Sequence, residues 1–262
     1  MQRYLRLYAH FLRFSFSRAM EFRLDFCFRI VMDSMFYGLQ LAFFAVLYRH
    51  TALLGGWTLD QSYVFVCGYF IIDAIHMTVF SNNLWWFPIF VNRGDLDYYL
   101  VRPVSTLFFM SLRDFAANSF VNLLIAAALL VWSLARFPGP LGAGRIAVYL
   151  ALLLLGTFLY YLLNLLFLLP VIWTQTGRGL DEMFFHFARF AERPDQIYRG
   201  WLRRMLVSLL PFALIVSYPA HALFDGLTPE TLLHMIGVVA AAFLLVLAVW
   251  RRALASYSSA SS

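Results

Sequence analysis

Long, continuous runs of hydrophobic residues follow one another along most of the chain. A helix needs roughly 20 residues to cross the ~30 Å hydrocarbon core of a bilayer. Six runs approach or exceed that length, near residues 26–48, 62–82, 106–134, 146–173, 202–224 and 231–250. Membrane β-strands would instead alternate apolar and polar residues over about 10 positions. The pattern therefore predicts an all-α integral membrane protein with six transmembrane helices.

The segment before the first run, residues 1–22, has a different pattern. Its polar side chains recur every three or four residues, at Arg3, Arg6, His10, Arg13 and Ser17. A helix with one polar and one apolar face is typical of helices that lie in the membrane interface. We predict an interfacial amphipathic helix here, and the alternative is a basic flank that only orients the first span. We expect no signal peptide, because no small-residue cleavage site follows a short apolar run.

A second amphipathic pattern lies between the fourth and fifth runs, over residues 174–200. An apolar stripe repeats at helical spacing, formed by Leu180, Phe184, Phe187 and Ala191. Pro194 would end this helix. We predict that residues 174–200 form a cytoplasmic amphipathic segment.

The fifth run contains two prolines, Pro211 and Pro219. A proline inside a helix removes a backbone donor and breaks the hydrogen-bond ladder. Non-helical backbone at membrane depth persists only where protein or water covers it. The run therefore predicts either a kinked span followed by a re-entrant turn near residues 218–224 or a simple proline kink.

Composition and charge support a membrane protein and orient it. The 262 residues are 62% hydrophobic and 13% charged, and all 20 basic residues are arginine. If both termini are cytoplasmic, fifteen arginines lie in cytoplasmic segments and three in external loops: Arg49, Arg136 and Arg145. This is the asymmetry of the positive-inside rule. It explains the net charge of +6 through the membrane surface and lipid, with no nucleic acid as partner.

Polar residues inside the apolar runs are few. Asp25, Arg29 and Asp33 follow at spacings of four, so they share one helical face and Arg29 can pair with both acids. A charge at this depth costs about 3 kcal/mol, which should turn the face toward protein. The other candidates are Asp73, His76, Arg113, Asn118 and Asn164. These groups either hold helices together or line a pathway, and the sequence leaves both open.

The loop between the second and third runs, residues 84–104, concentrates charge in NRGDLDYYLVRP, Asn92 to Pro103. After Gly94, Asp95 can cap a short helix, which Pro103 would end. Its apolar face would be formed by Leu96, Tyr99 and Leu100. Its opposite face would be formed by Asp95, Tyr98 and Arg102. Such a short helix is marginal alone, so we expect its apolar face to dock into a groove of another protein.

GDLDYYLVRP resembles a signature between the second and third spans of a branch of type-2 ATP-binding-cassette (ABC) permeases. MEFRLDF, residues 20–26, and PFALIVSYPA, residues 211–220, are also similar to that branch, in the same order. The resemblance implies one permease domain over residues 1–262 and a dimer with a second copy or a related permease. It also implies a soluble ATPase subunit that docks at a coupling helix. The coupling residues would be Gly94, Asp95, Leu96, Asp97, Tyr98, Leu100, Arg102 and Pro103.

The resemblance implies export across the plasma membrane, the bacterial inner membrane, of drugs, antibiotics, peptides or lipids. The chain has no GxxxxGK[ST] loop and no lysine, so ATP and Mg would bind the partner. Our leading hypothesis is that closure of two ATPase subunits pushes on residues 95–100 and alternates access to a pathway. An aromatic-rich interior suits a small amphipathic or hydrophobic compound.

Two alternatives belong to other classes. The first is a membrane scaffold without transport. The second is an integral-membrane enzyme, but the six histidines are scattered, and neither HExxH nor GxSxG occurs. We therefore expect no catalytic residues and no metal site on this chain. Cys27 and Cys67 are isolated, and we interpret them as small apolar residues.

Overall fold

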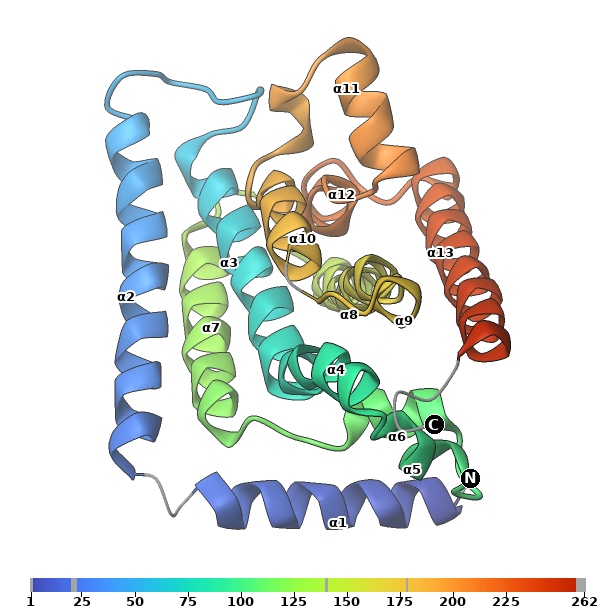
Figure 1. Ribbon diagram of the computed structural model, residues 1–262. Helices are drawn as coiled ribbons and strands as arrows, with labels where there is room; N and C mark the ends of the chain where they lie inside the picture. The colour runs from blue at the N-terminus through green and yellow to red at the C-terminus, as the bar shows by residue number, and fades with distance from the viewer. Residues whose placement is uncertain (1, 20–22, 140, 178, 258–262) are drawn as a thin grey trace.

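The computed structural model describes residues 2–19, 23–139, 141–177 and 179–257, and all of their regular secondary structure is helical (Figure 1). Within these described residues, five helical segments are long and apolar enough to cross a membrane. They are α2 (Arg23–Leu47), α3–η1–α4 (Leu59–Arg93), α7 (Ala117–Arg136), α8–α9 (Ala143–Thr174) and α13 (Pro229–Ser256). The predicted all-α membrane fold is confirmed.

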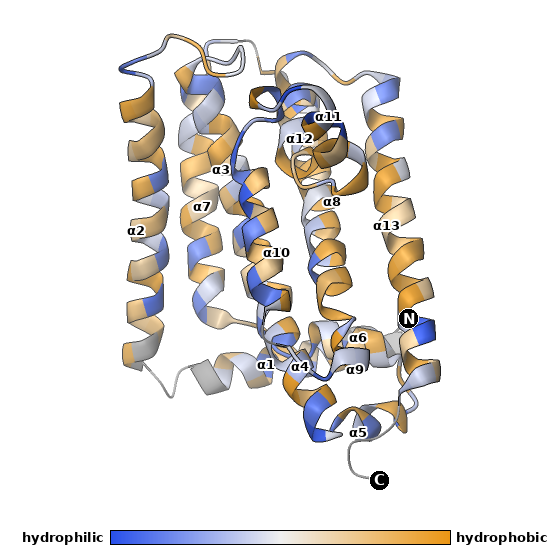
Figure 2. Cartoon of the chain, turned by 45° about the horizontal axis from the view of Figure 1, so that its top comes forward, coloured by the Kyte–Doolittle hydropathy of each residue, from blue (hydrophilic) through white to orange (hydrophobic). Residues whose placement is uncertain are grey.

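The shorter elements lie at the two ends of the bundle or between its long helices. Within the long segments, α3 is Leu59–His76, η1 Met77–Ser81, α4 Asn82–Arg93, α8 Ala143–Leu168 and α9 Val171–Thr174. The others are α1 (Gln2–Ala19), α5 (Leu96–Leu100), α6 (Thr106–Leu112), α10 (Leu180–Ala188), η2 (Arg189–Glu192), η3 (Asp195–Ile197), α11 (Gly200–Arg204), η4 (Met205–Leu209) and α12 (Leu214–Phe224). Apolar residues dominate the long helices along their length (Figure 2).

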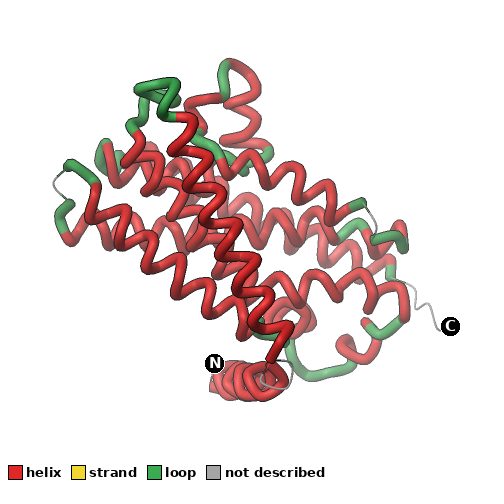
Figure 3. Tube along the Cα trace, turned by 90° about the vertical axis from the view of Figure 1, so that its left-hand side faces the viewer, coloured by secondary structure: helices red, strands yellow, loops and turns green. Residues whose placement is uncertain are grey.

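The helix α1 crosses one end of the bundle, which we call the α1 end (Figures 1 and 3). The helix predicted for residues 1–22 is thus present over Gln2–Ala19. Two side chains tie it to the bundle: Ser15 Oγ accepts from the Phe115 backbone at 3.1 Å, and Tyr4 Oη accepts from the Ser105 backbone at 3.3 Å. The α1 end also holds α5 and α6, and the loop over residues 48–58 lies at the opposite end (Figure 1).

The second predicted span extends further than expected. Residues 84–93 were predicted to be loop, but the helix continues through the π-turn η1 and past Pro88 to Arg93. It ends at Gly94, whose φ of 76° lies in the left-handed region that favours glycine. Leu59–Arg93 therefore forms one 35-residue helical segment that reaches from the opposite end to α5.

The third predicted span, residues 106–134, is wrong as a single helix. It divides into α6 and α7, because three successive backbone N–H groups are bound by other segments. Asp114 donates to Asn83 Oδ1 at 2.8 Å, Phe115 to Ser15 Oγ, and Ala116 to the Thr78 carbonyl at 2.9 Å. Asn83 also donates to the Asp114 carbonyl at 2.8 Å. These bonds fix the start of α7 against α1, η1 and α4.

The segment over residues 174–200 does not lie wholly on one side, which corrects the prediction of a cytoplasmic amphipathic segment. Gly177 packs against Pro88 at the α1 end, whereas Gln196 packs against Gly55 at the opposite end. The predicted stripe does form a helix, and its buried members Phe184 and Ala191 face the protein. The segment crosses the bundle because this aromatic stripe packs into the interior rather than onto a membrane surface.

The fifth predicted span, residues 202–224, is not one continuous helix either. Gly200–Leu209 and Leu214–Phe224 are bent against each other by 98°. Arg203 in the first part and His221 in the second bind the same carboxylate, Asp195, at 2.7 and 2.9 Å. Both outer ends of the pair therefore meet at one place, and the pair is a re-entrant hairpin. Its turn lies at Leu210–Ala213, and residues 218–224 are continuous helix through Pro219.

These corrections change the distribution of charge. Among the described residues, the chain between Gly177 and Gln196 also runs from the α1 end to the opposite end, beside the five long segments. Arg199, Arg203 and Arg204 lie beside α11 or within it, at the opposite end (Figure 1). The arginine asymmetry between the two ends is therefore smaller than the sequence indicated, although α1 begins and α13 ends at the same end, as expected.

Candidate functional site

The predicted coupling segment forms a short helix, α5, directly after Gly94. Asp95 occupies the N-cap position, but its side chain makes no capping hydrogen bond, which corrects the expected cap. Backbone bonds hold the turn instead: Asp97 N–H donates to the Gly94 carbonyl and Val101 N–H to the Asp97 carbonyl. Pro103 follows the helix in an exposed turn.

Two of the three residues predicted for the apolar face of α5, Leu96 and Tyr99, pack on their own chain rather than on a partner, and the third, Leu100, faces outward. Leu96 is fully buried and Tyr99 is 8% exposed. The Tyr99 ring lies 5.6 Å from Phe90 and 5.1 Å from Phe109. Its hydroxyl accepts a hydrogen bond from Arg113. These contacts join α5 to α4 and α6.

The outward-facing side chains lie in α5 and at its two caps. Tyr98 is 62% exposed, Leu100 36% and Val101 81%. Together with exposed Asp95 we call these four residues the docking face. Arg102 does not point freely away as predicted, because its guanidinium lies 4.3 Å from the Tyr98 ring and 5.1 Å from the Phe109 ring. It covers aromatic surface beside the docking face. Asp97 is half-buried next to them.

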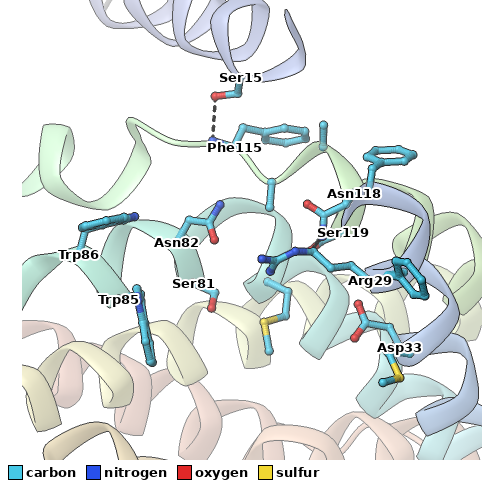
Figure 4. A pocket seen from close by; sticks show the side chains of 16 residues that line it. Ser15, Arg29, Asp33, Ser81, Asn82, Trp85, Trp86, Phe115, Asn118 and Ser119 are labelled. Atoms are coloured by element: carbon cyan, nitrogen blue, oxygen red, sulfur yellow. Dashed lines mark hydrogen bonds between the residues drawn. The ribbon is translucent and has the colours of Figure 1, made fainter. Parts of the chain in front are cut away.

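A pocket of about 790 Å³ opens between α1, α2, α4 and the start of α7 (Figure 4). We call it the α1–α4 pocket. Its polar lining comes from Ser15, Arg29, Asp33, Ser81, Asn82, Asn118 and Ser119. Trp85 and Trp86 of α4 form an aromatic wall and are 61% and 42% exposed. The structure thus brings together three predicted pathway residues, Arg29, Asp33 and Asn118.

Three acidic residues belong to neighbouring elements, α2, α3 and η2, and one of them, Asp33, lines the pocket. Asp33 of α2 accepts a hydrogen bond from Asn122 of α7. Asp73 lies in α3, one helical turn after Tyr69, and Glu192 lies in η2. Glu192 accepts from Gln40 at 3.4 Å and from Tyr69 at 3.5 Å. We call Asp33, Asp73 and Glu192 the acidic trio.

The family model of the ABC-2 family transporter protein matches residues 35–261. The chain belongs to this family. ABC-2 proteins are the membrane permease components of ABC transporters, which work with an ATPase partner. Comparisons with curated proteins and with solved structures gave no match.

The remaining predicted polar residues of this ABC-2 permease have separate environments. His76 and Asn164 contact each other at 3.3 Å, and the His76 ring lies 4.7 Å from Tyr160. Arg113 is not inside the bundle, because it binds Tyr99 at the α1 end. Asp25 lies in α2, and its side chain is outside the described residues. Arg29 and Asp33 both line the α1–α4 pocket, and the predicted pairing of Arg29 with Asp25 and Asp33 stays a prediction.

Glu192 is the main residue of the permease interior that sequence reasoning missed. The sequence analysis assigned Glu192 to a cytoplasmic segment, where an exposed acidic side chain is common and does not indicate a site. The signal that could have found it is its position one residue after Ala191, at the end of the aromatic stripe. Within the described ranges, no three His, Cys, Asp or Glu side chains are arranged to hold a metal ion.

Proposed function

We propose that the chain is the translocating permease subunit of an ATP-driven exporter of small amphipathic or hydrophobic compounds, such as drugs or antibiotics. The ATPase subunit, which holds ATP and Mg, docks on the docking face of α5. The permease pairs with a second copy or a related permease in the bacterial inner membrane, with its α1 end in the cytoplasm. The α1–α4 pocket and the polar groups beyond it belong to the pathway.

The observation that carries this proposal is the continuous path from α5 into the bundle. Tyr99 fixes α5 to α4 and α6 through Phe90, Phe109 and Arg113. α4 continues as one segment into α3, which carries Asp73. A force on α5 therefore moves the helix that lines the interior. A charged turn without packing contacts to α4 and α6 would not transmit such a force.

The paired hydrogen bonds of Asn83 extend this path to α7. The bonds between Asn83 and the Asp114 backbone join α4 to the segment that precedes α7. Ala116 donates to the Thr78 carbonyl in η1. Movement of α4 thus carries the start of α7 with it, and the start of α7 lines the α1–α4 pocket. Docking and pocket geometry are mechanically linked in this way.

Purification of the chain from its native host in mild detergent, followed by mass spectrometry, tests the proposal. We expect a soluble subunit with a GxxxxGK[ST] loop to copurify in stoichiometric amount. A second multispanning chain in the complex would show a heterodimer. If the chain purifies alone while other membrane complexes survive, the proposal fails and a scaffold without transport is favoured.

A further inference from the structure

Arg29 and Asp33 bring opposite charges to the α1–α4 pocket from one face of α2. They are four residues apart, so about 6 Å of helix separates them. Arg29 is exposed and Asp33 is half-buried, and both side chains line the pocket (Figure 4). Charged side chains on membrane-spanning helices are costly, and they pair with other groups or mark a functional site. The two charges are complementary to a ligand that itself carries both signs.

The pocket lies near the level of the lipid headgroups. The amphipathic helix α1 precedes α2 and crosses the α1 end, and α2 begins at Arg23 (Figure 1). Arg29 follows Arg23 by about 9 Å along the helix. Trp85 and Trp86 line the same pocket, and tryptophan is enriched where the bilayer meets water. A ligand at this level meets headgroups rather than the centre of the bilayer.

The mouth of the pocket lies on an apolar outer surface of the bundle. Its lining includes four exposed apolar side chains from α2 and α4: Phe28, Met32, Trp85 and Trp86. The rest of the chain covers little of α2, although α2 is apolar enough to span the membrane. A lipid can therefore keep its acyl chains in the bilayer against these side chains while its polar end enters the pocket.

Donors for a phosphate group surround Arg29. Figure 4 shows its side chain extending from α2 into the pocket toward Asn82 of α4, with Asn118 and Ser119 of α7 beside it. The Asn82 side chain makes no hydrogen bond to another described residue. A guanidinium carries five N–H donors in a planar fork that matches phosphate oxygens, and each amide adds two. This set of donors suits a phosphodiester.

Asp33 supplies an acceptor for an amine on the same ligand. It is the member of the acidic trio that lines the pocket. Asn122 donates to its Oδ2 atom, and a carboxylate accepts through both of its oxygens. The exposed rings of Trp85 and Trp86 add faces that attract cations. In phosphatidylethanolamine only two carbon atoms join the phosphate to the ammonium group, a link that can bridge two side chains one helical turn apart.

We propose that the α1–α4 pocket binds the headgroup of an aminophospholipid from the surrounding bilayer. Arg29, Asn82 and Asn118 hold the phosphate, and Asp33 accepts from the ammonium group. The acyl chains leave through the apolar mouth between α2 and α4. The inference goes beyond the proposed function and does not depend on transport, and a compound that enters the pathway here displaces the lipid.

The test is native mass spectrometry of the delipidated complex, with all of its copurified subunits, titrated with three lipids that share dioleoyl chains. Phosphatidylethanolamine carries both charges, phosphatidylglycerol carries the phosphate alone, and diacylglycerol carries neither. The variants Arg29→Gln and Asp33→Asn remove one charge each. Their matched controls are Arg13→Gln, on the exposed face of α1, and Asp60→Asn, in the first turn of α3.

We expect phosphatidylethanolamine to bind about tenfold more tightly than phosphatidylglycerol, and both more tightly than diacylglycerol, because each charged hydrogen bond adds affinity. Arg29→Gln should weaken both phospholipids by about tenfold, and Asp33→Asn should weaken phosphatidylethanolamine alone. The controls should bind as the unmodified chain does, and melting curves check that the variants fold. Equal binding of the three lipids, or unchanged phosphatidylethanolamine affinity in folded Arg29→Gln or Asp33→Asn, would overturn the proposal.

A second measurement locates the lipid without any variant. Phosphatidylethanolamine with a diazirine near the glycerol end of one acyl chain should crosslink, on illumination, to peptides that contain residues 26–33 or 82–86, which include the mouth of the pocket. Crosslinks confined to other segments would contradict the assignment even if the variants failed to fold.

These outcomes are separate from those of the native purification. If an ATPase subunit copurifies but the lipid does not bind, the pocket assignment fails and the exporter stands. If the lipid binds at this site in a chain that has no ATPase partner, the lipid site stands and the proposed function fails.

Discussion

At the scale of single residues, two neighbouring tyrosines have opposite roles. Tyr98 is 62% exposed and belongs to the docking face, whereas Tyr99 is 8% exposed and packs between Phe90 and Phe109. The sequence DYYL, residues 97–100, predicted one helix for both tyrosines but not what each side chain contacts. Helical spacing placed Tyr99 on the apolar face. It did not show that this face packs on α4 and α6 of the same chain.

The pair gives a test with an internal control. Tyr99→Ala should lower the free energy of unfolding by about 3 kcal/mol, because a buried ring is removed. Tyr98→Ala should leave melting unchanged and weaken binding of the ATPase subunit by about tenfold, since exposed tyrosines at interfaces are frequent hot spots. Melting in detergent and binding titrations measure both. The reverse assignment, an unstable Tyr98 variant and a stable Tyr99 variant, would contradict the structure.

Asp195 holds the two parts of the re-entrant hairpin together. It is fully buried and accepts two hydrogen bonds from Arg203, at 3.0 and 2.7 Å, and contacts His221 at 2.9 Å. Asp195→Ala should lower the free energy of unfolding by about 1.5–3 kcal/mol, because hydrogen bonds to a charged group are lost while Arg203, whose side chain is 48% exposed, stays partly hydrated.

The control for this variant is Asp225→Ala. Asp225 also contacts His221, at 3.1 Å, but its side chain is 69% exposed. Exposed pairs contribute about 0–1 kcal/mol, so its melting temperature should barely change. Equal melting of the two variants would show that Asp195 does not hold the hairpin.

At the scale of helices, α8 and α12 pack closely because of one glycine. A Cβ on Gly156 would meet the carbonyl oxygen of Ile215. This oxygen belongs to the backbone of α12, so it cannot move away as the end of a flexible side chain could. Gly156→Leu should therefore cost about 1–3 kcal/mol in unfolding free energy by overpacking. Gly144, on the same helix, has nothing within 4 Å of its Cβ position. Gly144→Leu should melt like the unmodified chain, and similar losses in both variants would refute this account of the packing.

Hydrophobic run length predicted helices well but not their breaks. The run over residues 106–134 carries Arg113 and Asp114 where α6 ends, and Ser15, Thr78 and Asn83 bind the backbone between this point and α7. These partners are distant in sequence, so periodicity does not reveal them. The stripe from Leu180 to Ala191 was predicted correctly as a helix face. Its partner was not, because amphipathic helices pack equally well on a membrane and on α8.

At the scale of the whole molecule, the side on which each loop lies follows from the crossing of residues 180–197. Gln196 packs on Gly55, so Arg199 should share a side with Arg49. In a Cys27→Ser background, Arg199→Cys and Arg49→Cys should react with an impermeant maleimide from one side and Tyr98→Cys from the other. Cys67 is fully buried and should stay silent. Labelling of positions 199 and 98 from the same side would contradict this arrangement and favour the prediction that residues 174–200 are cytoplasmic.

The account as a whole depends on where the ATPase subunit acts. A photo-crosslinking amino acid at position 98, in the docking face, should capture the nucleotide-binding subunit in native membranes. The same group at position 227 provides the control, because Leu227 is 38% exposed and lies between α12 and α13 at the opposite end. We predict a crosslink from position 98 alone. A crosslink from position 227, or none from position 98 in a complex that contains the subunit, would contradict the assignment of α5 as its docking site.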